Sequence, residues 1–165
     1  MSIIATDLDG TIFKGQTLID GVKEGLLKII NEGIEIYYTT NNSSQTPSEI
    51  KDKLEYLLQL NIDISKIITP LVIFQNLYSN NKSNIFIYGS DNLKNYIKNL
   101  NINVTSLENA ELVLIGRKEE NNFSEINEII KNVSLGKNIL SLNKDLTFPT
   151  EFGEKAGNGA VVKII

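Results

Sequence analysis

The chain has 165 residues, of which 41% are hydrophobic and 22% are charged, and its net charge is −4. This balance is typical of a globular protein with one core or a small core plus an added lobe, and the lack of basic clusters argues against a nucleic-acid-binding surface. Cysteine and histidine are absent, so any acid–base chemistry falls to carboxylates, lysines or tyrosines.

The beginning of the chain has no basic segment followed by a long apolar run, which argues against a signal peptide. No apolar stretch is long enough to span a membrane. We therefore expect a cytoplasmic protein that associates with neither membrane nor nucleic acid.

Apolar segments typical of strands alternate with amphipathic segments typical of helices. The expected strands cover residues 3–6 (fully buried), 34–39, 67–68, 85–88, 112–115 and 139–142. Helical spacing predicts helices over residues 20–33 (with Asp20 as N-cap), 48–58, 71–78, 93–100 and 123–133. Residues 13–19 predict a loop or small hairpin, and the polar run 79–84 predicts a linker. Strands that alternate with helices favour an α/β fold on a parallel sheet.

The first expected strand runs directly into Asp7-Leu8-Asp9-Gly10-Thr11. Residues two apart on a strand face the same side, so Asp7 and Asp9 would aim at one point while Leu8 faces the core. Ligands bind at the carboxyl edge of open parallel sheets. A buried carboxylate pair is costly unless a cation or a reaction uses it. The alternative is a solvated Asp-x-Asp-Gly turn with no chemical role.

This block resembles the first motif of the haloacid dehalogenase (HAD) superfamily of phosphohydrolases. Residues 40–43, Thr-Asn-Asn-Ser, resemble that superfamily's second motif, and residues 142–150 with 156–160 are similar to its 4-nitrophenylphosphatase or NagD-like branch. The resemblance implies a Rossmann-like core with an inserted α/β type II cap. The implied boundaries are residues 1–81 for the core, 82–152 for the cap and 153–165 for a segment that returns toward the core.

The resemblance also implies roles at the end of the first strand. Asp7 would attack phosphorus and form an aspartyl-phosphate, while Asp9 would protonate the leaving oxygen and then take a proton from water. Gly10 would turn the backbone, and Thr11 would hold the loop and orient Asp9.

Phosphate contacts are implied at two places. The Thr40 hydroxyl would donate to a phosphate oxygen, and backbone N–H groups near Leu8, Asp9 and Asn41 would add donors. Thr40-Asn41-Asn42-Ser43 by itself is most often only a loop or a helix cap. The substrate would be a small phosphorylated metabolite such as a sugar phosphate or a nucleotide.

Electrostatics then requires a cation. A phosphate dianion beside two carboxylates is repelled by roughly 4 kcal/mol for each unit-charge pair at ~4 Å in an effective dielectric near 20. Mg²⁺ would offset this repulsion, held by the Asp7 carboxylate and the Asp9 backbone carbonyl, with water and phosphate completing the octahedron.

Four residues of the expected cap are candidates to face the substrate. Arg117 and Lys118 lie where the family often shows Gly-x-Asp, and they would favour a second anionic group on the substrate or form a solvated turn. Asn143 and Asp145 would face the substrate or form a turn before Pro149. The Gly-Asn-Gly run at residues 157–159 favours a backbone turn over ligand contact.

The third and fourth motifs of the superfamily, a lysine and an acidic segment, are not visible before Ile165. We therefore expect weaker Mg²⁺ binding and impaired turnover if this chain acts alone. The first strand would also form an exposed edge, which tends to pair with another chain. A homo-oligomer or a complementing chain would satisfy that edge.

Two other classes of function stay open. One is a catalytically silent homologue that binds phosphate or a partner without turnover. The other is a phosphoacceptor receiver domain, which also uses clustered acids, a threonine and a lysine. The receiver fits poorly, because its phosphorylated aspartate belongs to a later strand and no second lobe is expected.

Overall fold

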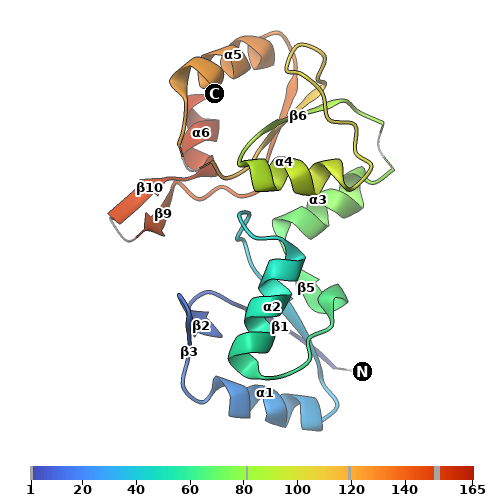
Figure 1. Ribbon diagram of the computed structural model, residues 1–165, viewed down its shortest axis with the longest axis vertical. Helices are drawn as coiled ribbons and strands as arrows, with labels where there is room; N and C mark the ends of the chain where they lie inside the picture. Colours follow the sequence, from blue (N-terminus) through green and yellow to red (C-terminus); the bar gives the residue numbers. More distant parts are fainter. Residues whose placement is uncertain (1, 81, 119, 151–152) are drawn as a thin grey trace. The chain divides into compact units, whose positions relative to one another are not determined.

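The computed structural model describes residues 2–80, 82–118, 120–150 and 153–165. The chain divides into two compact units, Met1–Val72 and Ile73–Ile165, and Figure 1 colours them from blue to red along the sequence. Most of helix α3 (Pro70–Tyr78) therefore belongs to the second unit, where Gln75 accepts a hydrogen bond from the Tyr96 hydroxyl at 3.3 Å. The implied boundaries after residues 81 and 152 fall at positions outside the described residues.

The first unit contains a three-stranded parallel sheet in the order β1-β4-β5. Its strands are β1 (Ile3–Asp7), β4 (Glu35–Thr39) and β5 (Ile67–Ile68). Asp7 lies opposite Thr39, and Thr39 lies opposite Ile68. The predicted parallel α/β sheet is thus confirmed, and the carboxyl ends of all three strands meet at one edge.

Two helices and a hairpin complete this unit. The expected small hairpin is present as β2 (Phe13–Lys14) and β3 (Thr17–Leu18), followed by α1 (Val22–Asn31), α2 (Pro47–Leu58) and the short 3₁₀ helix η1 (Ile64–Lys66). Helix α2 begins with a capping box, in which Thr46 and Glu49 each bond the other's backbone N–H. The N-cap of α1 is Gly21 rather than the predicted Asp20, because the chain enters that helix at a φ of 77°, a conformation that favours glycine.

Strand β1 is the edge strand of this sheet, and the prediction that it is fully buried is wrong. Ile3 is 60% exposed and Ile4 is 37% exposed. The physical reason is that β1 pairs only with β4 among the described strands, so one side of its backbone and much of its side-chain surface meet solvent. The core of the unit instead lies around Leu8, Ile36 and Leu54.

The second unit contains another three-stranded parallel sheet, in the order β6-β7-β8. Its strands are β6 (Ile85–Tyr88), β7 (Leu112–Ile115) and β8 (Asn138–Ser141), and its helices are α4 (Asp91–Lys98), α5 (Phe123–Ser134) and α6 (Asn158–Ile164). Helices α5 and α6 cover one face of the sheet, where Ile129 and Val161 pack against Val113 and Ile115 (Figure 1). Among the described residues, no helix has the length and apolar character needed to cross a membrane.

Helix α6 and the antiparallel hairpin β9 (Thr147–Thr150) with β10 (Gly153–Ala156) were not predicted. The described residues of β10 are exposed, so they lack the alternation of apolar and polar side chains that marks a half-buried strand. Gly157 and Gly159 lie where α6 meets the segment before β9. A Cβ on Gly157 would lie 2.3 Å from the Asp145 carbonyl oxygen, and one on Gly159 would lie 2.1 Å from that of Lys144. These glycines therefore allow close backbone approach.

We predict that Gly159→Ala destabilises the protein by about 1–3 kcal/mol, because the added methyl overlaps backbone that cannot move aside as a flexible side chain would. Thermal and urea unfolding measure the effect. Gly25→Ala in α1 is the matched control, since a Cβ there meets nothing within 4 Å. It should stabilise the helix by up to about 1 kcal/mol. Equal effects of the two variants would contradict the close-approach explanation.

Candidate functional site

The site predicted from the first motif lies at the carboxyl end of β1. Asp7 is the last residue of that strand, and the Thr39 hydroxyl on β4 donates to the Thr6 carbonyl at 3.1 Å. This bond ties the two strand ends together beside Asp7. The in-register pairing of Asp7 with Thr39 therefore brings Asp7 and the following residue of β4, Thr40, to the same edge of the sheet.

A tight turn follows Asp7 and carries Asp9. The Leu8 carbonyl accepts the N–H groups of Thr11, Ile12 and Phe13 at 3.2, 2.9 and 3.2 Å. Gly10, at a φ of 85°, donates its N–H to the Phe13 carbonyl at 2.8 Å. Leu8 is only 1% exposed, so its side chain faces the core as predicted and anchors the turn.

Asp7 and Asp9 are both exposed, which differs from the buried pair that the motif predicts. Water screens the repulsion between exposed carboxylates, so the pair costs the folded protein little. Burial therefore provides no argument for a cation here. The case for a cation depends instead on the phosphate that would have to approach two negative charges.

Thr40 begins an ordered loop between β4 and α2. Its N–H donates to the Ile68 carbonyl at 3.1 Å, and its hydroxyl oxygen accepts the N–H of Asn42 at 3.0 Å. A hydroxyl that accepts still carries its own proton, so the Thr40 O–H can donate to a phosphate oxygen. Asn41, also predicted to bind phosphate, lies exposed between these two residues.

The Asn42 side chain holds the rest of this loop. Its Oδ1 accepts the backbone N–H of Ser44 at 2.8 Å and the Ser44 hydroxyl at 2.7 Å, and its Nδ2 donates to Gln45 at 3.3 Å. An asparagine that bonds the backbone two residues ahead stabilises a turn. These bonds give the loop a local structural explanation, as expected of the alternative in which residues 40–43 form only a loop or a helix cap.

The donors near Asp7 and Asp9 suit a Mg²⁺ ion that keeps most of its water. Among the described residues no group of three or more acidic side chains could enclose a metal. Within residues 8–13, the backbone hydrogen bonds do not use the Asp9 carbonyl, so that oxygen and the exposed Asp7 carboxylate can both serve as ligands. Mg²⁺ is commonly bound by one or two carboxylates plus water and substrate phosphate, so the residues fit the ion.

Sequence reasoning missed one residue close to this site, Lys53 on α2. Burial lowers the pKa of the Lys53 ammonium, and the negative charge of Asp9 acts in the opposite direction and raises it. Lys53 follows the buried Ile50 by three residues, so it lies beside the apolar stripe of the helix. That position was the available signal for a lysine directed toward a neighbouring element, here Phe13 of the hairpin.

The predicted substrate-facing residues of the cap lie in the second unit. The Arg117 guanidinium stacks on the Phe148 ring at 3.7 Å, and Lys118 forms an ion pair with Glu125 beside the ring of Tyr88. Lys118 therefore already has a carboxylate partner within its own unit.

The other two predicted residues lie where the chain approaches α6. The Asn143 carbonyl accepts a hydrogen bond from the Ser141 hydroxyl, and the Asp145 carbonyl accepts the N–H of Gly159 at 2.9 Å. Both backbone groups thus have structural roles.

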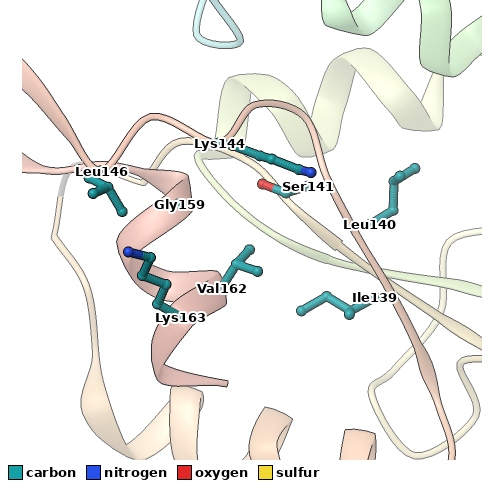
Figure 2. A pocket seen from close by; sticks show the side chains of 8 residues that line it. All are labelled: Ile139, Leu140, Ser141, Lys144, Leu146, Gly159, Val162 and Lys163. Atoms are coloured by element: carbon teal, nitrogen blue, oxygen red, sulfur yellow. The ribbon is translucent and has the colours of Figure 1, made fainter.

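A cavity of about 320 Å³ also lies in the second unit, between β8 and α6. Figure 2 shows Ile139 of β8 and Val162 of α6 pointing toward each other across it. It is lined by Ile139, Leu140, Ser141, Lys144, Leu146, Gly159, Val162 and Lys163. Because these residues include no carboxylate, the cavity cannot perform the chemistry predicted for Asp7 and Asp9.

An α/β protein with two aspartates beside a threonine at the carboxyl edge of a parallel sheet has the features of an acid-nucleophile phosphohydrolase. The sequence profile of the haloacid dehalogenase-like hydrolases matches residues 4–103. The chain belongs to that family, as the motif resemblance predicted.

Named relatives agree with this assignment. The acid sugar phosphatase of Staphylococcus haemolyticus is 31% identical over 163 residues, which cover 96% of this chain and 61% of the relative. The solved p-nitrophenyl phosphatase of Archaeoglobus fulgidus superposes with a TM-score of 0.88 at 22% identity, over 99% of this chain and 62% of its own. A glycerol phosphate phosphatase of Mycobacterium tuberculosis in complex with magnesium gives a TM-score of 0.81 at 23% identity, over 99% of this chain and 50% of its own.

These structures share the fold, and the predicted α/β architecture is confirmed. The chain spans about three fifths of the length of the curated relative.

We predict that Asn42→Ala destabilises the first unit by about 1 kcal/mol, because the loop loses its side-chain acceptor for Ser44. Chemical denaturation measures the change. Asn42→Asp keeps the acceptor oxygen and loses only the bond to Gln45, so it should retain most of the stability. If Asn42→Asp were as damaging as Asn42→Ala, the bonds to Ser44 would not be what holds the loop.

Proposed function

We propose that this chain carries the nucleophile and the acid–base residue of a phosphomonoester hydrolase. The observation that carries the proposal is the pairing of β1 with β4, which brings Asp7 and Thr40 to one sheet edge, with Asp9 on the adjoining turn. Membership of the haloacid dehalogenase-like hydrolases and the names of the relatives support the same reaction class.

The reaction would proceed in two steps. A carboxylate oxygen of Asp7 attacks phosphorus in line, the bond from phosphorus to the leaving oxygen breaks, and Asp9 gives that oxygen its proton. Water then attacks the phosphorus of the aspartyl-phosphate while Asp9 takes a proton from that water. The bond from phosphorus to the Asp7 oxygen breaks, so inorganic phosphate leaves and the Asp7 carboxylate is regenerated. The Thr40 hydroxyl donates to a phosphate oxygen throughout.

Mg²⁺ would be held by the Asp7 carboxylate and the Asp9 carbonyl, and when bound it neutralises the charge on the transferring phosphoryl group. The exposed positions of both residues leave room for water and phosphate in the remaining coordination sites. The similar glycerol phosphate phosphatase is known in complex with magnesium and in complex with calcium, which are both divalent cations that prefer oxygen ligands.

The substrate we propose is a small phosphorylated metabolite. One similar protein is named an acid sugar phosphatase and another a glycerol phosphate phosphatase, and phosphate esters of sugars and of glycerol are alkyl esters. Such esters have poor leaving groups, so proton donation by Asp9 would matter more for them than for an aryl phosphate.

A second candidate function is phosphate or partner binding without turnover. It is favoured by the absence of a third acidic side chain beside Asp7 and Asp9 among the described residues. Each missing electrostatic group commonly lowers the rate by about 100- to 1000-fold.

Turnover of 4-nitrophenyl phosphate with Mg²⁺ separates the two candidates. We predict measurable release of 4-nitrophenol by the wild-type chain and a loss of at least about 1000-fold in Asp7→Asn, because the amide cannot attack phosphorus. Asp52→Asn is the matched control, since Asp52 is an exposed carboxylate on α2, and it should keep wild-type activity.

Circular dichroism shows whether each variant is folded. A folded wild-type chain that releases no product would contradict the hydrolase proposal and support binding without turnover. Equal activity in Asp7→Asn and the wild type would remove Asp7 as the nucleophile.

We also propose that the open edge of β1 pairs with a strand of a second chain, because Ile3 and Ile4 expose apolar surface along an edge that no other described strand covers. Sedimentation should detect self-association, and Ile3→Lys should weaken it by at least about tenfold, since charged side chains disfavour edge pairing. Leu135→Lys, at a residue 78% exposed in the second unit, should change nothing. A monomeric wild type at all concentrations would contradict the pairing of two copies.

A further inference from the structure

The side chain of Lys53 packs in a way that is unusual for a surface lysine. Its ammonium lies 3.6 Å from the centroid of the Phe13 ring, and Phe13 is only 2% exposed. A cation over an aromatic face is attracted by the ring, and a packed methylene stem restricts where the ammonium can go. Lys53 is therefore held in place, unlike a lysine that extends freely into water.

The backbone of Phe13 leads directly to Asp9. The two residues form an isolated β-bridge, in which Gly10 donates to the Phe13 carbonyl at 2.8 Å and Phe13 donates to the Leu8 carbonyl at 3.2 Å. The ring beneath Lys53 thus belongs to the residue that is hydrogen-bonded to both chain neighbours of Asp9. A change in the packing of Lys53 on the Phe13 ring would therefore affect the position of Asp9.

Lys53 also differs in its charge partners from the lysine one half-turn earlier. Lys51 pairs with Glu55 at 2.8 Å along the helix surface. Lys53 takes part in none of the close ion pairs among the described residues. The β-bridge places Asp9 beside Phe13, whose ring lies under the Lys53 ammonium, and the negative charge of Asp9 raises the pKa of that ammonium. In the described part of the chain, no close carboxylate therefore competes with Asp9 for the charge of Lys53.

We propose that Lys53 is a positioning residue, whose ammonium, seated on Phe13, attracts the carboxylate of Asp9 and orients it toward the leaving oxygen of the substrate. This inference rests on the proposed hydrolase function. When Asp9 gives up its proton to the leaving oxygen it becomes an anion, and a fixed cation nearby stabilises the charge that develops. Sequence motifs do not assign this role to any residue of α2.

The dependence of kcat on the leaving group distinguishes a lysine that positions Asp9 from a lysine that only stabilises the fold. An alkyl phosphate such as glycerol phosphate needs the proton of Asp9, whereas 4-nitrophenolate departs with little help. Lys53→Met should lower kcat by about 10- to 100-fold on the alkyl ester and by less than about threefold on 4-nitrophenyl phosphate, with KM changed by less than about threefold on both. Lys53→Arg should restore the alkyl rate to within about fivefold of the wild type, and Lys51→Met is the matched control with unchanged rates.

A double-mutant cycle tests the contact without any turnover. Lys53→Met, Asp9→Asn and the double variant are compared with the wild type by chemical denaturation. Coupling should appear as a departure of about threefold or more in the unfolding equilibrium constant from the product of the two single effects.

Coupling together with the leaving-group dependence would support the proposal. Absence of coupling, or an equal loss of kcat on both esters, would overturn it. An inactive wild type with clear coupling would overturn the hydrolase proposal and leave the Lys53–Asp9 attraction standing.

Discussion

The parallel register between β1 and β4 is the constraint on which the candidate site depends. It places Asp7 opposite Thr39, and the bond from the Thr39 hydroxyl to the Thr6 carbonyl closes the strand ends at this point. A slip of one residue would turn Leu8 outward and the aspartates inward, because side chains alternate along a strand. The register therefore couples the burial of Leu8 to the exposure of the carboxylates beside it.

The turn after β1 positions Asp9 next to the end of the strand that carries Asp7. One carbonyl, that of Leu8, accepts three N–H groups, so the chain reverses within a few residues and returns to the core at Phe13. The hydrogen bonds of the turn leave the Asp9 carbonyl available as a metal ligand. They also connect the backbone around Asp9 with Phe13, whose ring contacts the Lys53 ammonium. The backbone of the turn thereby links α2, which carries Lys53, to the candidate acid–base residue Asp9.

The basic residues of the two units illustrate how neighbours decide what a charge can do. Lys118 has Glu125 as a partner and Arg117 is stacked on Phe148, so both are engaged within their own unit. The Lys53 ammonium lies on the ring of Phe13, the bridge partner of Asp9, and forms none of the close ion pairs among the described residues. All three are simply cations in the sequence, and packing alone distinguishes them.

The sequence by itself determined the alternation of strands and helices, the inward-facing Leu8 and the motif block from Asp7 to Thr11, because these depend on local periodicity and on residues close in the chain. Only the tertiary structure decided that Ile3 and Ile4 of β1 are exposed, that residues 158–164 form a helix against β8, and that the Lys53 ammonium lies on the Phe13 ring. Each of these depends on contacts between segments distant in sequence. Such contacts depend on packing and on the number of neighbouring strands. The local sequence pattern does not specify either of these.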